Sequence, residues 1–194
     1  MRIRSHWNKK KKERSLEEVA GALAFIEWRI AGNALLDLEN EGFQTDTQLQ
    51  RLDVLQELCA FLIHVTDRLV HDTMNAEERQ RFIVALALKL ADTYHDNRLD
   101  TDTSGEDFRQ SFIDTLNARM ADYAEFAFDG RKPGYALKRY LGEAVTRTMG
   151  ARDSKWISDQ VMEIEVPDML KTLEKGLKDL FESGSTESPS GAST

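Results

Sequence analysis

Apolar residues recur at intervals of three and four along most of this chain, which is the spacing of amphipathic helices. The first such stripe consists of Val19, Leu23, Ile26, Ile30, Ala34 and Leu38. Ser15 followed by Glu18 is typical of a capping box at a helix start, and Gly42 offers a left-handed stop. The pattern therefore predicts a first helix over residues 15–41.

Further helices are predicted along the rest of the chain, over about 45–72, 75–95, 104–130, 133–150 and 154–182. In the second of these, apolar residues cover more than half of the circumference, so we expect it to be the central helix. Pro133 fits the first turn of the fifth helix. Pro167 lies inside the last segment and is expected to break or kink it, because proline lacks a backbone donor.

These segments predict an all-α, single-domain bundle of about five to six helices with flexible termini. The 194 residues suffice for one buried core, and three prolines with eleven glycines are too few for an all-β protein. Three parts are expected: a basic flexible arm over 1–14, a helical domain over 15–182, and a disordered Ser/Gly/Thr-rich tail over 183–194.

Charge is spread unevenly over the chain. The net charge is −8, yet the arm is strongly basic, with Arg2, Arg4, Lys9, Lys10, Lys11, Lys12 and Arg14. The acidic remainder repels nucleic acid and anionic membranes, so binding to either would have to use the arm. A second basic segment, 131–155, contains Arg131, Lys132, Lys138, Arg139, Arg147, Arg152 and Lys155.

Several patterns favour a cytoplasmic location. The longest apolar runs are short and broken by charge, so we expect no transmembrane segment. The basic start leads into Glu13 and Glu17 rather than into the apolar stretch of a signal peptide. The single cysteine, Cys59, lies among leucines and is expected to be a buried, inert thiol.

Metal and cofactor motifs are weak in this sequence. Residues 100–111 begin like a calcium loop, but Ser111 stands where the loop requires a bidentate glutamate. A capped loop between helices is the expected structure, with Ser104 to Asp107 starting the fourth helix. Paired Glu-x-x-His motifs, zinc motifs and phosphate-binding loops are absent from the sequence, and we expect neither a metal nor a cofactor.

Two polar features invite a functional interpretation. The second helix carries a narrow polar stripe of Asp53, Glu57, His64, Asp67, Arg68 and His71, in which a carboxylate beside a histidine could raise the histidine pKa. The stripe is either a solvated face or a functional groove. Glu27 lies inside the apolar stripe of the first helix, and Arg68 or His64 is its expected partner if the two helices pack antiparallel. A structural pair is favoured over a catalytic one.

Three functions remain open. The leading hypothesis is a non-enzymatic interaction module (an adaptor, accessory factor or subunit) that binds another protein or itself through helix faces. Phe25, Trp28 and Leu36 support it, because they lie outside the main apolar stripe. The alternative is a binder of nucleic acid or anionic membrane that uses residues 1–14. The third is an enzyme or ligand-binding bundle that uses Glu27 and the polar stripe.

Overall fold

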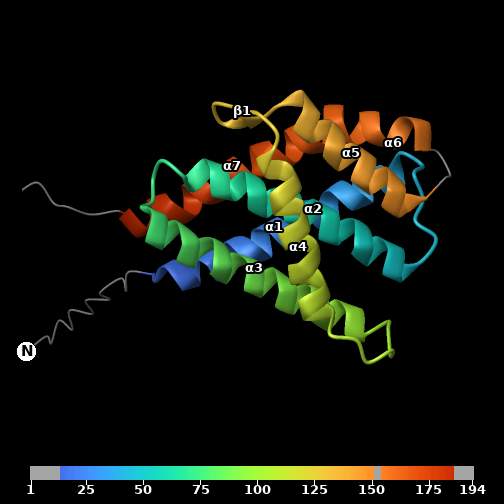
Figure 1. Cartoon of the computed structure of the whole chain (residues 1–194), viewed down its shortest axis with the longest axis horizontal. Helices are drawn as coiled ribbons and strands as arrows, with labels where there is room; N and C mark the ends of the chain where they lie inside the picture. Colours follow the sequence, from blue (N-terminus) through green and yellow to red (C-terminus); the bar gives the residue numbers. More distant parts are fainter. Residues whose placement is uncertain (1–13, 151–153, 186–194) are drawn as a thin grey trace, which may run out of the picture.

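Seven α-helices account for most of the described chain, in agreement with the all-α prediction (Figure 1). The computed structural model describes residues 14–150 and 154–185. The first five helices are α1 (Leu16–Asn40), α2 (Gln48–Val70), α3 (Ala76–Leu99), α4 (Phe108–Ala124) and α5 (Tyr135–Met149). The last helical run consists of α6 (Ser154–Gln160), a π-helical turn (Val161–Glu165) and α7 (Val166–Ser185).

The capping signals in the sequence operate as expected. Ser15 accepts from the backbone N–H of Glu18 at 3.1 Å, and the Glu18 carboxylate accepts from the N–H of Ser15 at 2.9 Å. Asn75 starts α3 with the same reciprocal box. Gly42 follows α1 with φ 97° and Gly150 ends α5 with φ 92°, the left-handed region that glycine adopts without a Cβ clash.

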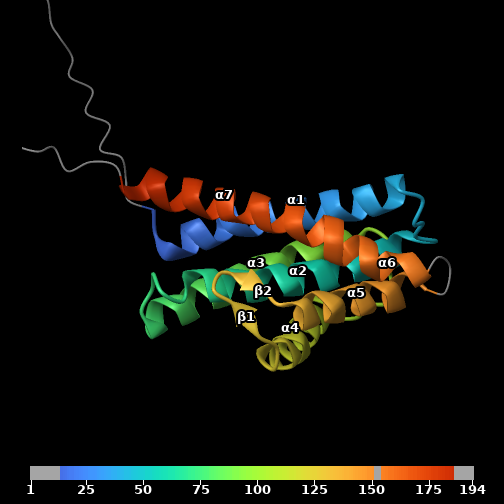
Figure 2. The ribbon, with the colours of Figure 1, turned by 90° about the horizontal axis from the view of Figure 1, so that it is seen from above.

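The helices form two layers. Seen from above, α1 and α7 lie side by side over the layer that contains α2 and α5 (Figure 2). The chain runs along α1 and returns along α7, so the end of α7 lies near the start of α1 (Figure 2). Helix α2 packs against α1, α3, α4 and α5, and every residue in 54–66 is buried. The prediction of a central second helix is confirmed.

The junction between α4 and α5 differs from the prediction. Helix α4 ends at Ala124, and a short hairpin follows with β1 (Phe128–Asp129) antiparallel to β2 (Lys132–Pro133). Gly130 turns this hairpin with φ 62°. Pro133 therefore belongs to β2, and the expectation that it starts the fifth helix is wrong. Gly134 caps α5 instead, where a side chain would meet the carbonyl oxygen of Ala127 at 2.8 Å.

Pro167 does not break the last helical run. The π-helical turn comes immediately before it, and the backbone N–H of Val166 donates to the carbonyl of Val161, five residues back. A proline inside a regular helix removes one bond and crowds the carbonyl four residues before it. The wider π turn takes up this misfit locally, so the run continues to Ser185.

Helix α1 is long and apolar enough to cross a membrane by length and composition, although the sequence analysis expected no such segment. Half of its most apolar stretch is buried inside the protein. Its buried residues include Leu23, Ala31 and Leu38, which belong to the hydrophobic core. Core helices of water-soluble bundles meet the same criterion.

Candidate functional site

The first part of the polar stripe of α2, Asp53 and Glu57, is paired with arginines of neighbouring helices, and Glu57 is buried. Arg98 of α3 donates to Asp53 at 2.7 Å, and Arg119 of α4 donates to both oxygens of Glu57, at 2.6 Å each. Helix α4 crosses α2 and α3 (Figure 1). Its Arg119 therefore reaches Glu57 on α2. Neither a solvated face nor an open groove describes this part of α2.

Arg119 of α4 contacts side chains of two other helices, α2 and α5. Its guanidinium lies 5.8 Å from the ring centre of Tyr140 on α5, and the Tyr140 hydroxyl donates to Asp122. The hydrogen bonds to Glu57 raise the pKa of Arg119 above its ordinary value. This network joins α2, α4 and α5, and each charged group in it has a partner. Sequence spacing could not reveal it, because its members come from three separate helices.

His64 is buried among aromatic rings. Its ring centre lies 5.3 Å from that of Tyr123 and 6.4 Å from that of Phe128. Burial, with a smaller contribution from the Arg68 charge, lowers the pKa of His64 to about 4 against the opposing effect of Asp67. The expected rise in this pKa is therefore wrong, because desolvation outweighs the neighbouring carboxylate.

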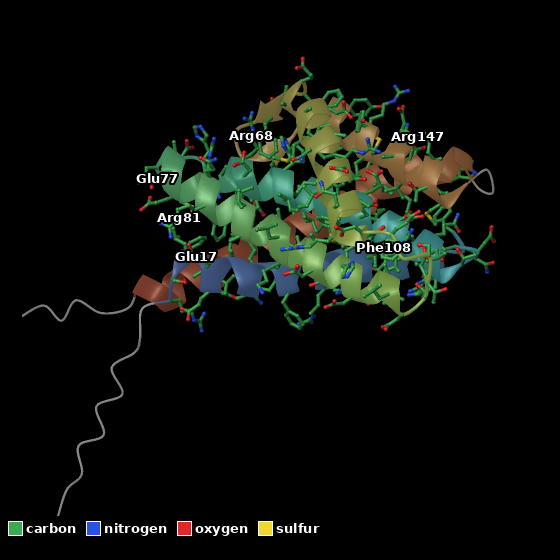
Figure 3. All side chains as sticks on the ribbon, turned by 60° about the horizontal axis from the view of Figure 1, so that its bottom comes forward. Glu17, Arg68, Glu77, Arg81, Phe108 and Arg147 are labelled. Carbon is green, nitrogen blue, oxygen red and sulfur yellow. The ribbon has the colours of Figure 1, made fainter. Side chains whose placement is uncertain are left out.

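The rest of the stripe faces outward at the end of α2. Asp67 pairs with Arg79 of α3 at 3.4 Å, and exposed His71 pairs with Asp72 at 2.9 Å. The Arg68 guanidinium lies over the Phe128 ring at 5.6 Å, near the β hairpin (Figure 3). The six stripe residues thus serve separate contacts and do not converge on one catalytic constellation.

Glu27 is fully buried between α1 and α2, as its place in the apolar stripe predicts. Its partner is Thr66, whose hydroxyl donates to Oε1 at 2.6 Å, and the expected pairing with Arg68 or His64 is wrong. At 100° per residue, positions 64 and 68 each point about 200° away from position 66, which faces α1. Burial raises the pKa of Glu27 to about 8, against the hydrogen bond from Thr66.

The aspartate-rich loop at 100–107 is a turn and a helix cap. Asp102 accepts from the backbone N–H of Ser104 at 2.9 Å. Asp107 accepts from the N–H of Gln110 and starts α4, so Ser104 is not the cap. Within 14–150 and 154–185, no group of three or more His, Cys, Asp or Glu residues is arranged to hold a metal ion.

A basic groove between α7 and the start of α5 is the strongest candidate site. We call it the lysine groove; its cavity volume is about 540 Å³. Its lining combines five lysines, one carboxylate and an apolar floor: Lys132, Lys138, Lys171, Lys175, Lys178, Glu174, Pro133, Val166, Pro167 and Leu170. Lys178 pairs with Glu182 at 3.7 Å. Four of the five lysines are exposed, and Lys138 is half-buried.

The sequence indicated only two of the five lysines of this groove. The basic segment at 131–155 supplied Lys132 and Lys138, and its Arg131 lines a smaller neighbouring cavity. Arg139 and Arg147 line a separate cavity with Glu143 and Asp159. The side chains of 152 and 155 lie outside the described residues. The missed signal was on α7, where Lys171, Lys175 and Lys178 follow the spacing of one helix face.

The predicted arm lies outside the described residues except for Arg14, which is exposed. The tail from 186 onward lies outside them as well. Anion binding by the arm therefore stays a prediction. Comparisons of the chain with protein-family models, curated proteins and solved structures gave no match.

Proposed function

We propose that this protein is a cytoplasmic, non-enzymatic interaction module that binds an acidic segment of a partner protein in the lysine groove. One observation carries the proposal: five lysines surround an apolar floor on a chain whose net charge is −8. Like charges gathered along one groove repel one another, so an anionic ligand would be attracted there. The dispersal of the candidate catalytic residues supports binding rather than chemistry.

The composition of the groove favours a protein ligand over a nucleic acid. Its lining has no aromatic side chain on which bases could stack, and stacking is a main source of affinity for single strands. Glu174 lies among the lysines, and a peptide can place a neutral or basic side chain opposite it, whereas a phosphate backbone carries a negative charge at every nucleotide. Pro167, which is exposed, and Leu170, which is half-buried, offer apolar contacts that a phosphodiester chain cannot use but leucine or phenylalanine side chains can.

A binding experiment with defined ligands tests this function. We would titrate the protein into a fluorescein-labelled 16-residue peptide rich in Glu and Leu, at two salt concentrations, and measure anisotropy. We expect Lys171→Glu/Lys175→Glu/Lys178→Glu to weaken binding at least 10-fold, because three attractive charges become repulsive. Lys89→Glu is the matched control, since Lys89 is exposed on α3 away from the groove.

The same titration separates the alternatives. A single-stranded oligonucleotide and vesicles with anionic lipid replace the peptide in parallel runs, with and without residues 1–14. Equal peptide binding by the triple variant and the wild type would contradict the proposal. Tight binding of the oligonucleotide or the vesicles that disappears with residues 1–14 would favour the arm as the functional element.

A further inference from the structure

A second, smaller cavity continues the lysine groove along α7. Its volume is about 160 Å³, and it shares Glu174 and Lys178 with the groove. The rest of its lining comes from α2, the hairpin and the end of α7: Leu69, Val70, Thr73, Arg131, Leu177 and Phe181. It therefore adds another apolar floor and another cation to the same face.

Together the two cavities follow α7 from Val166 to Phe181. At a rise of about 1.5 Å per residue, this stretch is about 22 Å long, or about four helical turns. Lys171, Lys175 and Lys178 are spaced along it at intervals of four and three, so their side chains occupy one face. The site is thus an elongated groove that is apolar at both ends and basic along its length.

The lining offers no sheet edge that an extended ligand could use. A ligand that binds as a β-strand needs free backbone donors and acceptors on its receptor. Most of this lining belongs to α2, α5 and α7, and the backbone groups of a helix bond to one another within that helix. In β2, Lys132 pairs with Asp129, and Pro133 has no N–H to donate. A helical ligand satisfies its own backbone and needs only side-chain contacts.

Resting on the proposed function, we infer that the acidic segment binds as an amphipathic helix of about 15 residues that lies along α7 and spans both cavities. Its apolar side chains occupy the floors around Leu170 and Leu177. Its carboxylates face Lys171, Lys175 and Lys178, and Glu174 at the shared middle favours a basic or neutral residue opposite it. Charge complementarity and the length of the groove together define this ligand.

Three 16-residue peptides test the inference. The first carries a stripe of Leu along one helix face with Glu on both flanks of that stripe; the second has the same composition in scrambled order; the third keeps the first pattern with two central prolines. We expect the first to bind at least 10-fold more tightly than the others and to gain helical circular dichroism on binding. The second cavity is tested by Thr73→Glu, which we expect to weaken the first peptide about 3- to 10-fold. The exposed loop variant Thr103→Glu is its control.

The outcomes distinguish this inference from the function on which it rests. If all three peptides bind the wild type equally and none binds Lys171→Glu/Lys175→Glu/Lys178→Glu, the helical ligand is overturned. The proposed function, binding of an acidic segment, is then kept. Unchanged binding in Thr73→Glu would confine the ligand to the lysine groove and also overturn the inference. If no peptide binds the wild type, the proposed function fails, and the helical ligand fails with it.

Discussion

The arginines of the bundle and the lysines of α7 use their charges in different ways. Seven arginines of the described chain form ion pairs with carboxylates: Arg51–Glu39, Arg79–Asp67, Arg81–Glu17, Arg98–Asp53, Arg109–Asp92, Arg119–Glu57 and Arg139–Glu143. Most of these pairs join two different helices, as Glu17 of α1 and Arg81 of α3 do (Figure 3). The five lysines of the groove instead surround a cavity with one carboxylate in its lining.

The physical chemistry of the two side chains explains this division. A guanidinium offers a planar fork that binds both oxygens of a carboxylate, as Arg119 does with Glu57, and this geometry fixes helices relative to each other. A lysine is a strongly hydrated point charge on a flexible stem, which leaves it available to a ligand. Most of the arginine pairs therefore join helices, while the lysines of α7 line the groove in which we propose that the ligand binds.

The largest effect is expected at the Glu57–Arg119 pair. Arg119→Met leaves the Glu57 carboxylate, which is 7% exposed, without its main partner, and we expect it to lower the free energy of unfolding by about 3 kcal/mol. Urea denaturation measures this change. Asp122→Asn is the control, because its partly exposed carboxylate is the lesser partner of Arg119 and should cost about 1 kcal/mol or less.

A double-mutant cycle sharpens this prediction. The double variant Glu57→Gln/Arg119→Met should lose at least about 1 kcal/mol less unfolding free energy than the two single variants lose together. The reason is that the second substitution removes a side chain that has already lost its ionic partner. Strict additivity would mean that the two side chains do not interact in solution.

A smaller, pH-dependent effect is expected at Glu27, a buried carboxyl without a cationic partner. Its folded-state pKa of about 8 exceeds the ordinary 4.5, so its contribution to stability is fully present below pH 4.5 and is lost as pH rises to about 8. Between pH 6.5 and pH 8 this loss amounts to about 1.5 kcal/mol. The pKa of His64 is lowered to about 4, so this histidine makes the free energy of unfolding rise with pH only between pH 4 and 6.5. That range lies outside the interval from pH 6.5 to 8.

Denaturation at a series of pH values checks this expectation. Glu27→Gln should flatten the profile above pH 6.5, because glutamine keeps the shape and cannot ionise. Thr66→Val is a second probe, since it removes the one hydrogen bond to the carboxylate and should raise the pKa further. A wild-type profile that is already flat from pH 6.5 to 8 would mean that Glu27 is ionised throughout this range.

The sequence predicts those parts of the fold that depend on local signals. Helix starts at Ser15 and Asn75 and helix ends near Gly42 and Gly150 follow from capping and φ preferences that act within a few residues. The hairpin at 128–133 was missed because two-residue strands have no periodicity to detect. The π turn before Pro167 was missed because it forms only when the helix continues through the proline, and the sequence favoured a break or kink there.

The candidate sites were harder to predict, because each depends on contacts between helices. Glu27 was correctly expected in the core, but its partner depends on which residue of α2 faces α1, and that residue is Thr66. Glu57 of the α2 stripe looked solvent-facing because its partner, Arg119, belongs to α4, which comes much later in the chain. Two of the five lysines of the groove lie in the basic segment that the sequence indicated, and the other three depend on the position of α7 beside that segment.

The smallest effect on stability is expected at the lysines themselves. Lys171→Gln/Lys175→Gln/Lys178→Gln removes two repulsive pairs, Lys171–Lys175 and Lys175–Lys178. It also removes five attractive pairs at spacings of three and four, with Asp168, Glu174 (twice), Asp179 and Glu182, each pair being worth about 0.2–0.5 kcal/mol. The free energy of unfolding should therefore fall by only about 1 kcal/mol, while acidic-peptide binding falls at least 10-fold. Urea denaturation and anisotropy on the same preparation compare the two quantities. A loss of more than about 2 kcal/mol would place these lysines with the arginines, as parts of the fold.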